Sequence, residues 1–133
     1  MVSFNSLMAA PTFFTTVDTP RNLARTQFSG KLTAVEMHAA AAELELIVRQ
    51  LNQGFTLFVN FGAVTSMDLD CAPHLTRIMD ILRAHGMALV VRILPKHAND
   101  IGINMLSIVH YRGTIKTVTV ETLDEAERIL ATP

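Results

Sequence analysis

A short run of apolar residues in the middle of the chain, at 55–61, constrains the fold most. It consists of Phe-Thr-Leu-Phe-Val-Asn-Phe, which is too short for a typical globular helix and too uniformly apolar for a strand with one face in water. We therefore predict a central β-strand that is covered on both faces. A second run of this kind, at 87–94, ends at Pro95 and predicts another buried strand.

Helical signals lie between these runs. Thr33 and Glu36 have the spacing of a capping box, and the apolar residues behind them recur at helical spacing as far as Gly54. In chain order we predict a loose arm (1–11), a hairpin (12–17 and 24–29), a helix (34–52), a strand (55–61), a loop (62–67), a helix (68–86), a strand (87–94), an almost entirely apolar helix (99–113), a strand (115–120) and a helix that begins at Thr122.

This alternation of strands and helices predicts the fold class. Successive strands that are joined through helices need crossover connections and therefore lie parallel, while the hairpin adds an antiparallel pair at one side. We expect a single α/β domain over residues 1–133, with a small mixed, mostly parallel β-sheet and four helices.

Composition narrows the classes of partner. Half of the 133 residues are apolar, 17% are charged, and the net charge is −1, which gives no electrostatic reason to expect nucleic acid or an anionic membrane as partner. The single cysteine, the absence of a signal peptide and the absence of a membrane span predict a cytoplasmic protein. Seven Met, seven Phe and a mean hydropathy of +0.33 predict a protein partner or a homodimer.

The start of the helix at 68–86 carries the residues most suggestive of chemistry. Cys71 and His74 lie on one helical turn beside Asp70, and a thiol at a helix N-terminus has a lowered pKa. A thiol-based enzyme is therefore one alternative, although no glycine-rich oxyanion element accompanies the pair and a cysteine is also a small buried hydrophobe. We predict no metal and no cofactor, because there is neither zinc spacing nor a nucleotide fingerprint, and the other histidines are scattered at His38, His85, His97 and His110.

The order of elements from 12 to 131 resembles the STAS domain, the fold of anti-sigma factor antagonists. The segment 28–33, Phe-Ser-Gly-Lys-Leu-Thr, is similar to that family's Gly-x-Leu entry to the first helix, and the chain closes on a Thr-Leu-Asp-Glu-Ala helix. The resemblance implies a non-enzymatic regulator whose partner is a protein, namely an anti-sigma factor or serine kinase.

Asp68 falls where the family's Asp-Ser-Ser-Gly motif begins, but the next residue is Leu69. In phosphorylated members that position accepts phosphate, which switches binding to the kinase off, and leucine has no hydroxyl. Either Ser66 or Thr65 takes the phosphate instead, or Asp70 holds a permanent negative charge that imitates part of it. We prefer the role for Asp70, because it needs no realignment. The surface that the resemblance implies consists of Thr65, Ser66, Asp68, Leu69, Asp70, Cys71 and His74.

The sequence allows two alternative interpretations, one of the two carboxylates and one of the whole protein. Asp68 and Asp70 are alternatively only caps of the helix, which are common in every fold. The protein as a whole is alternatively a binding module that holds a small apolar or anionic molecule between the helices at 68–86 and 99–113.

Overall fold

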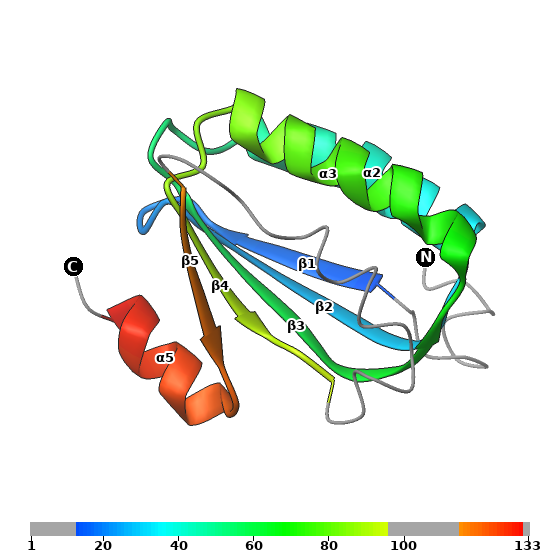
Figure 1. Ribbon diagram of the computed structural model, residues 1–133. Coiled ribbons are helices and arrows are strands. Elements are labelled where there is room, and N and C mark those ends of the chain that lie inside the picture. The colour runs from blue at the N-terminus through cyan, green and yellow to red at the C-terminus, as the bar shows by residue number, and fades with distance from the viewer. Residues whose placement is uncertain (1–12, 96–114, 132–133) are drawn as a thin grey trace, which may run out of the picture.

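A five-stranded sheet with helices on both faces forms the structure, a computed structural model that describes residues 13–95 and 115–131 (Figure 1). Its elements are β1 (Phe13–Asp18), β2 (Leu23–Leu32), α2 (Ala34–Val48), β3 (Thr56–Met67), the 3₁₀ turn η1 (Leu69–Cys71), α3 (Ala72–Ala84), β4 (Leu89–Ile93), β5 (Lys116–Val120) and α5 (Leu123–Ala131). The described residues thus hold three of the four predicted α-helices. The predicted arm at 1–11 and the whole of the predicted helix at 99–113 lie outside them.

The topology is the predicted one. The strands lie in chain order across the sheet, with β1 antiparallel to β2 and all other neighbours parallel. The crossover helices α2 and α3 lie together over one face, and α5 lies on the other face near β4 and β5 (Figure 1). None of the helices in the described ranges is long and apolar enough to cross a membrane.

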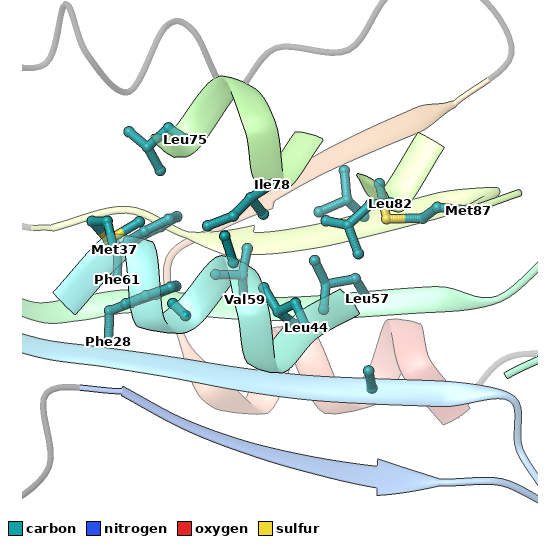
Figure 2. Close-up of a cluster of buried hydrophobic side chains, with 14 of the residues drawn as sticks. Phe28, Met37, Leu44, Leu57, Val59, Phe61, Leu75, Ile78, Leu82 and Met87 are labelled. Atoms are coloured by element: carbon teal, nitrogen blue, oxygen red, sulfur yellow. The ribbon is translucent and has the colours of Figure 1, made fainter. Parts of the chain in front are cut away.

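The core confirms that β3 is covered on both faces. Leu57, Val59 and Phe61 point into the main core beneath α2 and α3 (Figure 2), whereas Phe58 belongs to a second cluster with Ala126 of α5. Alternate residues of one strand therefore serve two cores, which explains why the run at 55–61 is almost continuously apolar.

The predicted loop at 62–67 is wrong, because β3 continues to Met67. These residues pair with the second half of β2, ending at Leu32 opposite Met67, with two register shifts along the way. At the start of this segment the Gly62 N–H donates to the Asn60 side chain at 2.7 Å within the strand. The partner strand lies some 35 residues earlier in the chain, so no local signal reveals this pairing.

The helix boundaries confirm the capping signals and correct the C-terminal ends. The Glu36 carboxylate accepts the Thr33 N–H at 2.9 Å, as the capping box predicts. However, α2 ends at Val48, so Gly54 does not follow it directly. Instead Gly54 has φ +88° in the later turn, where its N–H donates to the Gly86 carbonyl at 2.7 Å. Gly86 has the same φ and ends the second helix as predicted.

Polar contacts tie α5 to the outer face of the sheet. Arg25 of β2 forms a two-pronged ion pair with Glu127, and Arg21 donates to the Leu130 carbonyl at 2.9 Å. The Arg25 guanidinium lowers the pKa of the Glu127 carboxyl, and Glu127 in turn raises the pKa of Arg25.

Candidate protein-interaction surface

Two helix starts lie at the same edge of the molecule. The parallel strands β2 and β3 end together, because Leu32 pairs with Met67 and the Asp68 N–H donates to the Leu32 carbonyl at 3.0 Å. Each strand then leads into a helix over the same face of the sheet, so the first turns of α2 and of η1 and α3 are neighbours (Figure 1). Helix starts leave backbone N–H groups unpaired and carry a partial positive charge, which suits them to polar recognition.

Leu69 and Val35 stand out from these two helix starts. They are 80% and 78% exposed, the highest values among the large apolar side chains of the described residues. Leu69 is flanked by Asp68 and Asp70, which are both exposed as well. Single exposed apolar residues are ordinary on protein surfaces, but two on neighbouring helix starts, with carboxylates beside them, make a surface with the mixed character of a protein contact.

The carboxylates are not explained as helix caps. Asp68 is the N-cap residue of η1, but its side chain makes no capping hydrogen bond. The N-cap of α3 is Cys71, which makes none either. Asp70 lies in the first turn of η1, where its charge suits the helix dipole without a specific bond.

Cys71 is placed differently from the prediction. Its side chain is fully buried, and its thiol donates to the Leu32 carbonyl at 3.5 Å. Burial raises the pKa of the Cys71 thiol, and the Asp68 carboxylate raises it further, so the predicted lowered pKa is wrong. Since the thiol points into the core, Cys71 cannot itself contact a partner on this surface. Its raised pKa also removes the reason for proposing a thiol nucleophile.

Thr65 and Ser66 belong to the paired end of β3 and not to a loop. Thr65 is exposed and Ser66 is half-buried, and Ser66 lies opposite Lys31 of β2. These hydroxyls therefore lie on a strand before the helix start, whereas Leu69, which the sequence resemblance predicted at the phosphoacceptor position, lies in η1.

His74 brings α2 into the surface. Its half-buried ring packs edge-on against the exposed ring of His38, with ring centroids 5.6 Å apart. Sequence reasoning missed His38 and Val35 as surface residues. A signal existed, because they are three residues apart in the first turns of a helix and so share a face. Among the described residues no group of three or more His, Cys, Asp or Glu could hold a metal ion.

Room for a small ligand is limited beside α3. The apolar cavity between α2, α3 and the sheet has a volume of about 30 Å³, and Phe28, Phe61 and Ile78 are among its lining residues. That is room for about one water molecule and not for a metabolite. The predicted ligand site between the helices at 68–86 and 99–113 lies partly outside the described residues.

Comparisons with known proteins identify the fold. No protein-family model matches the chain, and no curated protein matches it. Among solved structures, the chain is similar to the anti-sigma factor antagonist SpoIIAA in its unphosphorylated form, with a TM-score of 0.60 and 15% identity over 90% of this chain and 98% of that one. At this identity the likeness shows the fold, and it confirms the predicted STAS-like architecture.

Proposed function

We propose that this protein is a non-enzymatic regulator that acts by binding another protein through the starts of α2 and α3. The interaction surface consists of Val35, His38, Leu69, Asp70 and His74. The observation that carries the proposal is the exposure of Leu69, 80%, between two exposed carboxylates that cap nothing. A leucine in this position gains little for folding and offers apolar area to a partner.

The partner that we propose is a serine kinase of the anti-sigma type. Two observations support this choice: the sequence resemblance to anti-sigma factor antagonists, and the likeness of the fold to SpoIIAA. Leu69 occupies the position at which members of that family accept phosphate, and it has no hydroxyl. Binding to the kinase is therefore not switched off by phosphate at this position.

Asp70 takes over part of the phosphate's role in this proposal. It is exposed, it lies next to Leu69 in η1, and it carries a fixed negative charge. Phosphate weakens binding to the kinase in the family, and it does so reversibly. In this protein the charge of Asp70 lowers the affinity for the kinase permanently.

Calorimetric titration of a purified anti-sigma serine kinase from the same genome tests the proposal. We expect binding whose affinity is the same with and without Mg-ATP, and we expect Asp70→Asn to strengthen it. Asp124→Asn is the matched control, because Asp124 is also an exposed carboxylate in the first turn of a helix, α5, on the other face of the sheet.

Three results would contradict the proposal. Failure to bind any such kinase excludes the proposed partner. Loss of binding with Mg-ATP, together with phosphate on Thr65 or Ser66, would show that phosphorylation switches off binding to the kinase, as it does in the family. Equal affinities of the wild type and Asp70→Asn remove the role of Asp70.

A further inference from the structure

Within the described ranges, one edge of the sheet carries no lysine, proline or bulge that would hinder strand addition, and its one charged residue, Asp18, is the last of the strand. β1 is the edge strand, and within the described ranges it pairs only with β2, in an unbroken register from Phe13 opposite Phe28 to Asp18 opposite Leu23. The outward N–H and C=O groups of an edge strand are a template for a further strand. Natural edges are blunted by lysine, proline or bulges, and the run Phe-Phe-Thr-Thr-Val of β1 has none of these.

The opposite edge shows the contrast. β5 begins with the exposed Lys116, and α5 packs against it directly after the strand. Both edge strands have a regular register and high β-propensity, but only β5 carries a lysine and is followed directly by a helix that packs beside it.

We infer that β1 pairs with β1 of a second copy of this chain, antiparallel and about a two-fold axis at Thr15. In this register Phe13 lies opposite Val17 of the second copy, and Phe14 lies opposite Thr16. The two five-stranded sheets would join into one continuous sheet.

The faces of β1 select this register. Phe13 and Val17 pack against the main core, and Thr15 shares their face, whereas Phe14 and Thr16 line the opposite face. Pairing about Thr15 keeps every residue opposite one of its own face and makes aromatic–β-branched pairs, which stabilise sheets. A shift of one residue opposes unlike faces. A shift of two in one direction places Asp18 opposite Phe14, and a shift of two in the other direction leaves only Phe13, Phe14 and Thr15 of β1 paired.

Phe14 gains the most from this pairing. Its side chain is 59% exposed at the rim of an open hollow of about 240 Å³ on the outer face of the sheet, which Thr16, Phe58 and Leu123 also line. Phe14 of the second copy lies beside Thr16 and extends this apolar rim. In this register only five residues of each β1, 13–17, lie opposite one another, and so short a contact buries less than the roughly 1,200–2,000 Å² of stable interfaces. The dimer is therefore weak and depends on concentration.

Cysteine cross-linking measures the register directly. Opposed residues in antiparallel strands have Cα atoms about 4.5–5.5 Å apart, within the range of a disulfide. We expect Thr15→Cys to form a disulfide-linked dimer under mild oxidation and Thr16→Cys to form none, because two Thr16 residues are out of register in this pairing. The wild type is the control, because its single cysteine, Cys71, is buried and should form no disulfide between two copies. Cross-linking of Thr16→Cys alone would overturn the register.

Sedimentation of the full-length wild type tests the dimer itself. We expect association at high micromolar concentration, weakened at least about tenfold by Phe14→Lys. Leu46→Lys, at an equally exposed site on α2, should leave association unchanged. A monomer at millimolar concentration, together with no cross-linking of either cysteine variant, overturns the inference. These experiments need no kinase, so they stand or fall independently of the proposed function.

Discussion

Replacing Leu69 by alanine should separate folding from binding. The side chain is 80% exposed, so only about one fifth of it is buried by folding. Full burial of a leucine is worth about 1.5–3 kcal/mol, and Leu69→Ala should therefore lower the free energy of unfolding by only about 0.3–0.6 kcal/mol. Met37 of the neighbouring α2 is fully buried, and Met37→Ala should cost about 2–5 kcal/mol.

The larger effect of Leu69→Ala should appear in the affinity for the partner. About four fifths of the side chain remain to be buried in a complex, which corresponds to about 1.2–2.4 kcal/mol. Since each 1.4 kcal/mol is a factor of ten, the Kd for the kinase should rise about 8- to 60-fold.

Urea unfolding and calorimetric titration of the same samples check both parts of this prediction. Leu46→Ala is the matched control, because Leu46 is 60% exposed on α2 and lies eleven residues, about 16 Å, along the helix from Val35. Its side chain is about two fifths buried, so Leu46→Ala should lower the free energy of unfolding by about 0.6–1.2 kcal/mol and leave the affinity unchanged. Equal losses of affinity in the two variants would refute the role of Leu69, and so would a loss of stability above about 2 kcal/mol in Leu69→Ala.

Four further predictions concern the buried Cys71 and the two glycines Gly54 and Gly86. Iodoacetamide should modify Cys71 in the native protein at least about a thousandfold more slowly than a free thiol, because the reagent reaches the thiol only when the structure opens. Modification at the rate of a free thiol would contradict the burial of Cys71. The raised pKa of the Cys71 thiol contributes stability that is fully present below the ordinary thiol pKa of about 8.5 and is lost as the pH rises through the folded-state value. In urea unfolding between neutral pH and about pH 9.5, the free energy of unfolding should therefore fall less steeply with pH in Cys71→Ala than in the wild type. Gly54→Ala should cost about 1–2 kcal/mol for its left-handed backbone. Gly86→Ala should cost at least about 1 kcal/mol more, because its Cβ would lie 2.9 Å from Gln53 Cγ and 3.2 Å from Gln53 Cα, and equal losses in thermal unfolding would contradict that contact.

The order of elements was predictable because its signals are local. The capping box at Thr33 and Glu36, the glycine at Gly86 and the apolar run at 55–61 each depend on a few neighbouring residues. Parallel pairing then follows from the crossover connections alone. Fold class could therefore be reached from one sequence, and the likeness to SpoIIAA agrees with it.

Features that depend on distant parts of the chain were missed. The segment 62–67 reads as a loop until β2 is known to extend to Leu32 and to pair with the residues from Ala63 to Met67. Cys71 has the spacing of an exposed helix-start residue, but the short η1 turn before α3 aims its thiol at the Leu32 carbonyl. In each case the deciding contact crosses more than thirty residues of sequence.

The exposure of Leu69 supports the proposed interaction surface independently of the likeness in fold. A residue that contributes only about 0.3–0.6 kcal/mol to folding is not placed there by the needs of folding. A polar residue would serve the fold equally well and would keep an apolar group out of water. Val35, at the start of the adjoining helix, is a second apolar side chain of this kind, with 78% of it exposed. Two side chains that are unfavourable in the free protein would become favourable once a partner covered them, which is what the proposed function requires, and this needs no phosphate acceptor.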